Sequence, residues 1–155
     1  MKLKKLLLIF FLLPISCMAK KESEFEKMLA GFPECKFENL YVDYKTHEPQ
    51  HQYFKERGLM PNKVENEAAF FNVNEKFHGM PVDEIVISAG YTIVSIRFVA
   101  PPESVEQKMR AFLKNGYNKE PLPAGSDAAM LTPLLKRNIT SPQKTNLTCD
   151  FEANY

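Results

Sequence analysis

The sequence has no tryptophan and only three histidines, three cysteines and six glycines among its 155 residues. With so little glycine, no glycine-rich loop follows a predicted strand, as a phosphate-binding loop would, and no serine has the Gly-x-Ser-x-Gly setting of a nucleophile elbow. The sequence also has no large net charge, because its 20 Lys and Arg residues nearly balance its 19 Asp and Glu residues. Without a basic block, the sequence does not predict binding to nucleic acid or to an anionic membrane surface.

The most distinctive feature present is a hydrophobic N-terminal segment. Lys2, Lys4 and Lys5 precede an unbroken apolar run over residues 6–13, which Pro14 ends. This order is typical of a secretory signal, here of bacterial appearance, and the run is shorter than the roughly 20 apolar residues that span a bilayer. We therefore predict an exported protein, either periplasmic or secreted.

The end of this segment, PISCMAKK, fits two processing routes. Ala19 suits a signal peptidase, whose cut would leave a soluble chain that starts at Lys20. Alternatively, Ser16 directly before Cys17 resembles the bacterial lipoprotein box, and a lipid on Cys17 would make the product an outer-membrane lipoprotein. We favour the soluble product because Pro14 stands where that box usually has leucine. A membrane contact is expected only through this candidate lipid anchor.

Removal of a signal peptide of residues 1–19 from the 155 leaves 136, enough for one domain with a substantial core, residues 20–155. This domain keeps only two cysteines, Cys35 and Cys149. In an oxidising compartment such a pair is most simply a disulfide, and closing a loop of about 100 residues contributes roughly 4.7 kcal/mol in the chain-entropy description. We predict that this bond ties the two ends of the domain together.

Hydrophobic periodicity predicts an α+β fold, with a mainly antiparallel sheet of about five or six strands and helices packed on one face. The predicted strands are 35–44, 68–77, 82–88, 94–98, an edge strand within 128–137, and 147–152, which carries Cys149 inward. The predicted helices lie between residues 23 and 31, over 49–59 and over 101–117. The disulfide would then join the last strand to the first.

Two groups of reactive side chains have plainer interpretations. His47 and His51, four residues apart, would share a helix face as zinc ligands do, but Pro49 places His47 at or before the helix start. They are weak metal candidates, and we predict no metal and no cofactor. Asp83 and Glu84 are adjacent carboxylates, which point to opposite faces of a regular strand, so we expect them to be solubilising residues rather than an acid–base pair.

The tyrosines are better candidates for a binding surface, because a partly exposed tyrosine offers apolar area together with a hydrogen-bonding hydroxyl. They are Tyr41, Tyr44, Tyr53, Tyr91 and Tyr117. Since no reaction centre is evident, we predict a non-enzymatic exported binding protein, an inhibitor or immunity-type partner of another exported protein.

Two other functions stay open. A carrier of an apolar ligand or lipid would need a cavity between the sheet and the helix of residues 103–115. A small hydrolase would need His47, His51 or His78 within hydrogen-bond reach of a carboxylate or hydroxyl in a cleft.

Overall fold

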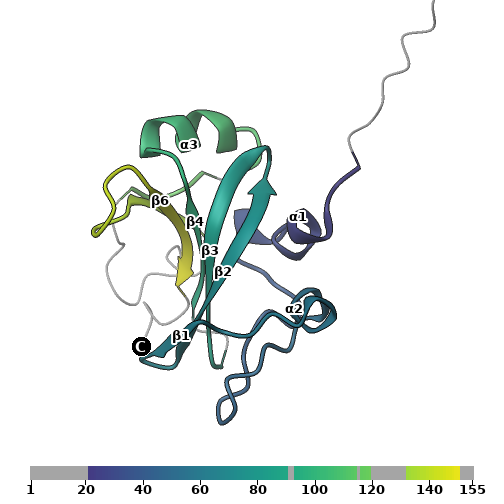
Figure 1. Cartoon of the computed structure of the whole chain (residues 1–155). Helices are drawn as coiled ribbons and strands as arrows, with labels where there is room; N and C mark the ends of the chain where they lie inside the picture. The colour runs from purple at the N-terminus through teal and green to yellow at the C-terminus, as the bar shows by residue number, and fades with distance from the viewer. Residues whose placement is uncertain (1–20, 91–92, 115, 120–131, 151–155) are drawn as a thin grey trace, which may run out of the picture.

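The structure of the protein, a computed structural model, describes residues 21–90, 93–114, 116–119 and 132–150. Within these residues one six-stranded antiparallel sheet has the order β1-β2-β3-β4-β6-β5 (Figure 1), which confirms the predicted α+β fold. The strands are β1 (Lys63–Glu65), β2 (Ala68–Phe77), β3 (Met80–Ser88), β4 (Ile93–Phe98), β5 (Leu134–Arg137) and β6 (Thr145–Asp150). The helices are α1 (Glu24–Met28), the short 3-10 helix η1 (Phe32–Glu34), α2 (Gln52–Arg57) and α3 (Pro102–Met109).

The two long hairpins at the centre of the sheet lie where the sequence predicts them. β2 and β3 are joined at His78 and Gly79, whose φ angles of 48° and 79° are both positive, as a type I′ turn requires. β3 then pairs with β4 along its length, with Ile85 opposite Ile96. In β2, β3 and β4, the pattern of apolar side chains along each strand and the turn residues between the strands are therefore enough to determine the pairing.

One face of the sheet forms the hydrophobic core. A single row of cross-strand neighbours runs through five strands: Phe71, Ile85, Ile96, Leu147 and Leu135. All five side chains are buried, so each strand contributes to one continuous apolar layer.

The helices cover this layer. Phe25 of α1 and Phe54 of α2 are buried in the same cluster as Val105 and Met109 of α3. In Figure 1, α1 and α2 lie next to each other beside β2, and α3 lies at the far end of the sheet. Burying a large apolar side chain contributes about 2–3 kcal/mol, so these buried side chains hold the helices on the sheet.

The Cys35–Cys149 disulfide is present, with 5.5 Å between the two Cα atoms, and both residues are buried. The expected strand over 35–44 is wrong, however. Cys35 has a left-handed conformation at the end of η1, Asn39 is left-handed as well, and Val42 forms only isolated bridges. Left-handed residues interrupt the extended backbone that a strand needs, so the bond joins β6 to a turn rather than to a first strand.

The helix ends also differ from the predicted ones. α1 begins with a capping box, in which the side chains of Ser23 and Glu26 each accept a hydrogen bond from the other residue's backbone N–H. α2 starts after His51 rather than at Pro49, and α3 ends at Met109. α2 ends in a Schellman motif, in which the Leu59 N–H donates to the Phe54 carbonyl beyond left-handed Gly58.

The two outer strands are short. β1 has three residues, all exposed, and its pairing with β2 was not expected from the sequence. β5 lies at the opposite edge, as predicted for this segment, although residues 128–131 of the predicted strand lie outside the described residues.

Candidate functional site

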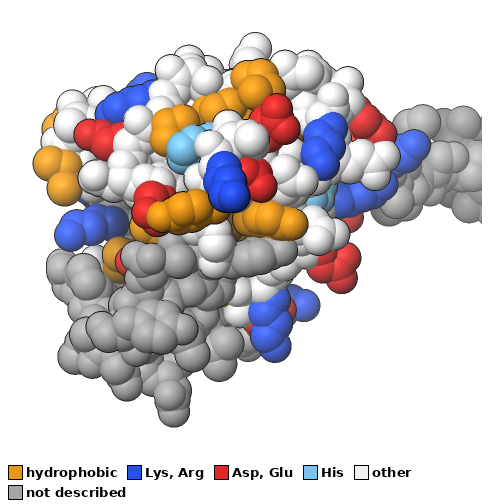
Figure 2. All heavy atoms as spheres, turned by 90° about the horizontal axis from the view of Figure 1, so that it is seen from below, with side chains coloured by type: hydrophobic (Ala, Val, Ile, Leu, Met, Phe, Trp, Pro, Cys, Tyr) orange, Lys and Arg blue, Asp and Glu red, His pale blue; other side chains and the backbone are white. Residues whose placement is uncertain are grey.

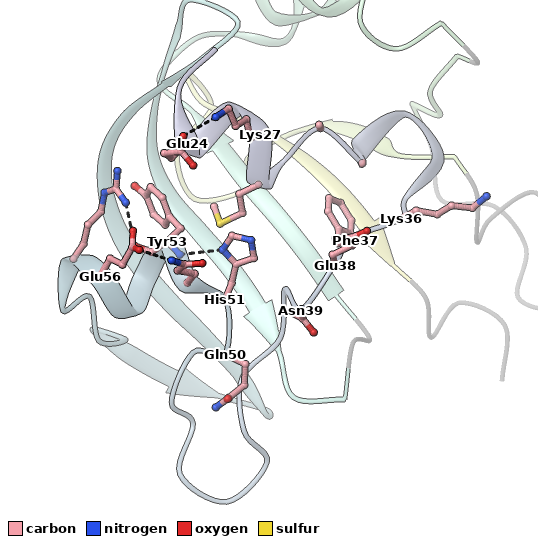
Figure 3. Close-up of a pocket in the computed structure, with 15 residues that line it drawn as sticks. Glu24, Lys27, Lys36, Phe37, Glu38, Asn39, Gln50, His51, Tyr53 and Glu56 are labelled. Atoms are coloured by element: carbon pink, nitrogen blue, oxygen red, sulfur yellow. Dashed lines mark hydrogen bonds and ion pairs between the residues drawn. The ribbon is translucent and has the colours of Figure 1, made fainter. Parts of the chain in front are cut away.

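A polar groove of about 680 Å³ lies between α1 and α2. Its walls come from three stretches of chain: residues 24–31, residues 36–39 and residues 50–57 (Figure 3). η1 connects residues 24–31 to residues 36–39. Cys35, the residue directly before this second stretch, is disulfide-bonded to Cys149 of β6. The disulfide therefore holds one wall of the groove to the sheet.

The inner surface of the groove is partly apolar. Met28 and Tyr53 are buried, and Phe37 is half-buried on the opposite wall. Phe37 packs edge-on against Phe32 of the core, with 5.1 Å between the ring centroids and an angle of 83° between the planes. This contact fixes the aromatic wall in place.

His51 lies between Tyr53 and Phe37 in Figure 3 and is the residue that caps α2. Its ring nitrogen Nδ1 accepts a hydrogen bond of 3.1 Å from the Tyr53 backbone N–H. An accepting Nδ1 carries no proton, so in the neutral ring the proton is on Nε2. Burial lowers the pKa of His51, which favours this neutral form.

Tyr53 connects the groove to the sheet. Its hydroxyl donates a 2.7 Å hydrogen bond to Oε1 of Glu75 on β2, and the Arg57 guanidinium lies 4.1 Å from the centre of its ring. Burial, together with the bond to the Glu75 carboxylate, raises the pKa of the Tyr53 phenol. The tyrosine is thus a neutral donor fixed in position.

The rim of the groove is charged but balanced. Lys27 forms an ion pair of 2.7 Å with Glu24, and the amide of Gln52 donates to Glu56 on the other side. The hydrogen bond from Lys27 lowers the pKa of Glu24. Because most of these charges have partners inside the groove, the site has no strong field of either sign.

The two candidate metal ligands are not on one helix face. His47 has a positive φ of 56° in the turn before α2, and His51 is the capping residue with one nitrogen already engaged. Among the residues that the structure describes, no group of three or more His, Cys, Asp or Glu side chains lies close enough to hold a metal ion.

The candidate tyrosines occupy different parts of the molecule. Tyr53 is in the groove, Tyr117 contacts Glu106 of α3, and Tyr41 and Tyr44 belong to the loop before α2. Tyr44 is 65% exposed and donates to Glu67. Figure 2 views this end of the molecule and shows apolar side chains among charged ones. Tyr91 lies outside the described residues.

Asp83 and Glu84 are not on opposite faces, as their adjacency in a strand suggested. Both accept hydrogen bonds of 2.8 Å from Arg97, at Nε and at an Nη atom respectively, and Lys144 donates to the other oxygen of Asp83. The pairing of β3 with β4 shifts register between Val82 and Glu84, and such a bulge turns neighbouring side chains to one side. The two carboxylates are neutralised in an ion-pair network on the outer face of the sheet.

The space between α3 and the sheet is filled by side chains. Val105, Met109 and Leu113 are buried there and belong to the same cluster as Phe98. A second hollow, of about 480 Å³, lies between η1 and the end of α3, and the residues that line it include Pro33, His78, Lys108 and Phe112.

The fold and the groove define a disulfide-bonded α+β domain with a polar groove between two short helices. Comparison of the chain with protein-family models, with curated proteins and with solved structures finds no match. No described helix combines the length and the apolar character needed to cross a membrane. The predicted signal peptide and Cys17 lie outside the described residues.

Sequence reasoning identified Tyr53 and His51 but not the groove that joins them. Met28, Phe37 and Gln50 line the same hollow and were not singled out. Phe37 carries no local signal, because its role depends on the turn at Cys35 and on contact with Phe32. Spatial assembly, rather than a motif, produces this site.

Proposed function

We propose that the chain is an exported, non-enzymatic binding protein whose groove between α1 and α2 holds a segment of another exported protein. The observation that carries this proposal is the groove itself, with about 680 Å³ of space, apolar residues inside and hydrogen-bonding side chains along both walls. Binding sites typically combine such apolar area with a few fixed polar groups.

The histidines favour binding over hydrolysis. Among the described residues, no histidine ring has a hydrogen bond to a carboxylate or hydroxyl that would make it a general base. The ring of His51 is tied to the Tyr53 backbone, and the ring of His78 contacts the rings of Phe77 and Phe112. A fixed donor in a groove suits recognition of a partner.

Two observations support export. The disulfide is typical of oxidising compartments, and the first 19 residues have the order of a secretory signal. We propose a periplasmic or secreted protein without a cofactor and without nucleic-acid partners, soluble from Lys20 onward. The intact mass of the mature protein tests the processing: cleavage before Lys20 predicts an unmodified chain, whereas two or three acyl chains on Cys17 would show an anchored lipoprotein.

Site-directed photo-crosslinking tests the proposed function. A photoreactive residue at Gln52, exposed on the groove rim, is expected to capture one protein from a periplasmic extract. The matched control is Lys136, exposed on β5 outside the groove, which should not capture it. The captured protein is then purified and its dissociation constant measured with the native chain and with Gln52→Arg.

Weakening of that complex by Gln52→Arg, but not by Lys136→Ser, supports the proposal. Equal capture at the two positions, or a dissociation constant that Gln52→Arg leaves unchanged, contradicts it. Both residues are exposed, so folding is not expected to change in either variant.

A further inference from the structure

One polar atom in the groove is available to a ligand. The imidazole of His51 is half-buried, its Nδ1 is used by the Tyr53 N–H, and its Nε2 has no hydrogen-bond partner among the described residues. A ligand acceptor at this atom would replace solvent with a hydrogen bond in a partly desolvated groove. Figure 3 shows the ring facing the hollow between Tyr53 and Phe37.

We propose that His51 is the specificity-determining donor of this groove, and that its Nε2–H binds a backbone carbonyl of an uncharged polypeptide segment. This inference rests on the proposed function and names the chemistry of its partner. The proposed binding depends on the imidazole ring and the shape of the groove. The dipole of α2 contributes little, because this helix has only six residues.

The hydrogen bond at Nδ1 decides between a neutral and an anionic acceptor. A carboxylate or phosphate is bound best by a cationic imidazolium, in which both ring nitrogens are donors. A proton on Nδ1 would replace the acceptor that holds the Tyr53 N–H and would remove the cap of α2. The ring is therefore kept as a neutral donor, which matches an amide carbonyl.

The charges that line the groove sum to zero and give an anion no net attraction. Three cations and three carboxylates line the groove: Lys27, Lys36, Arg57, Glu24, Glu38 and Glu56. Lys27 is paired with Glu24, and Arg57 is stacked on Tyr53 and donates to its carbonyl. With the charges balanced, an anion is not concentrated at the site.

The rest of the groove suits an extended peptide backbone. Asn39 lines the groove and carries an amide that both donates and accepts, as peptide groups do, whereas the amide of Gln50 already bonds the Glu48 carbonyl and the Lys55 ammonium. Phe37 provides a half-buried apolar surface for one side chain of the bound segment, and buried Met28 lines the same groove. The expected ligand thus has an apolar or aromatic residue next to the carbonyl that His51 binds.

Two small probes test this chemistry without a known partner. N-acetylphenylalanine methylamide has neutral carbonyls and an aromatic side chain, and N-acetylphenylalanine has the same side chain with a carboxylate. Each is titrated at millimolar concentration into the protein with ¹⁵N-labelled histidine. The methylamide is expected to shift the His51 Nε2 resonance saturably. It should also bind at least about fivefold more tightly than the acid, a difference in binding free energy that corresponds to about one hydrogen bond.

Variants separate recognition from folding. Asparagine is a preferred N-cap, so His51→Asn should keep the cap of α2 and lose the donor, reducing methylamide affinity at least about fivefold. The control His47→Asn, in the turn outside the groove, should leave the affinity unchanged. Tighter binding of the acid, no saturable shift at Nε2, or equal affinity of His51→Asn and the native chain would overturn the inference.

The outcome is distinguishable from that of the crosslinking experiment. If Gln52 captures a partner that binds His51→Asn as well as the native chain, the proposed function stands and the role of His51 is wrong. If the probes bind as expected but no protein is captured, the chemistry of the groove stands and the protein partner is wrong.

Discussion

Tyr53 and Glu75 are joined by a 2.7 Å hydrogen bond that links α2 to β2. Glu75 lies where the pairing of β2 with β3 shifts register, between Asn72 and Glu75. The irregularity in the sheet and the position of the helix are therefore connected through one phenol and one carboxylate. Since Tyr53 also lines the groove, this bond fixes the site relative to the sheet.

Removal of the Tyr53 hydroxyl should destabilise the protein. A hydrogen bond to a charged group contributes about 2 kcal/mol, and Tyr53 is only 3% exposed, so Tyr53→Phe should lower the free energy of unfolding by about that amount. Urea unfolding measures the change. The matched control is Tyr44→Phe, because Tyr44 also donates to a glutamate, Glu67, but is exposed. A midpoint that falls equally in both variants would contradict the role of the buried bond.

The fold was predictable where its determinants are local. Strand β2 runs from Ala68 to Phe77, as the strand-like composition and the following His78–Gly79 turn indicate. The turn that contains Gly90 likewise indicates that β3 and β4 pair with each other. The stretch 35–44 has equally strand-like composition, but left-handed Cys35 and Asn39 bend it away from the sheet. β1 has three exposed residues and so no alternation to detect.

The candidate site was predictable only in part. Pro49 correctly places His47 before the helix, yet nothing identifies His51 as the cap, since caps are usually Ser, Thr, Asp or Asn. The joint position of Asp83 and Glu84 depends on a β-bulge, which leaves no mark in the sequence. Sites made from separated segments need the tertiary structure.

The disulfide should contribute to stability and to the groove together. The double variant Cys35→Ser and Cys149→Ser is expected to lose about 2–5 kcal/mol of unfolding free energy, because the open chain gains entropy when unfolded. Guanidinium unfolding of the oxidised native protein and of the double variant measures the difference in their unfolding free energies. Since residues 36–39 follow Cys35 directly, the variant should also bind the methylamide probe less tightly under conditions where it is folded. Unchanged unfolding midpoints would contradict a stabilising role.

Asp83 should make stability depend on acid pH. Burial alone would raise its pKa, but hydrogen bonds from Arg97 and Lys144 outweigh burial and hold the pKa of Asp83 below its ordinary value. The resulting stabilisation is complete above the unfolded pKa of about 3.9 and is lost as pH falls through the lower folded value. Asp83→Asn should therefore reduce the unfolding free energy by about 1 kcal/mol at neutral pH.

The same variant should also flatten the acid part of the stability profile. Urea midpoints at about pH 7 and about pH 2 should differ less in Asp83→Asn than in the native chain. Glu65→Gln is the control, since Glu65 pairs with Lys63 on the exposed strand β1 and is expected to leave the profile unchanged. A full acid-dependent loss in Asp83→Asn would show that other carboxylates cause it.

Gly31 should be the least replaceable glycine among the described residues, for a steric reason. A Cβ atom at this position would lie 1.5 Å from the Lys36 carbonyl oxygen and 2.6 Å from its carbon. These are backbone atoms of the groove wall, held by the Lys36 N–H bond to the Gly31 carbonyl, so they cannot move aside as a flexible side chain does. Gly31→Ala should displace residues 36–39, cost at least about 3 kcal/mol and reduce methylamide binding.

The control for this substitution is Gly58→Ala at the end of α2. Gly58 has a φ of 59° and open space around its Cβ position, so alanine should cost only about 1 kcal/mol of left-handed strain. Its probe affinity should be that of the native chain, because Gly58 does not line the groove. If Gly31→Ala unfolds at the same urea concentration as Gly58→Ala, the close approach of residues 31 and 36 does not constrain the wall, and the groove is less rigid than the structure shows.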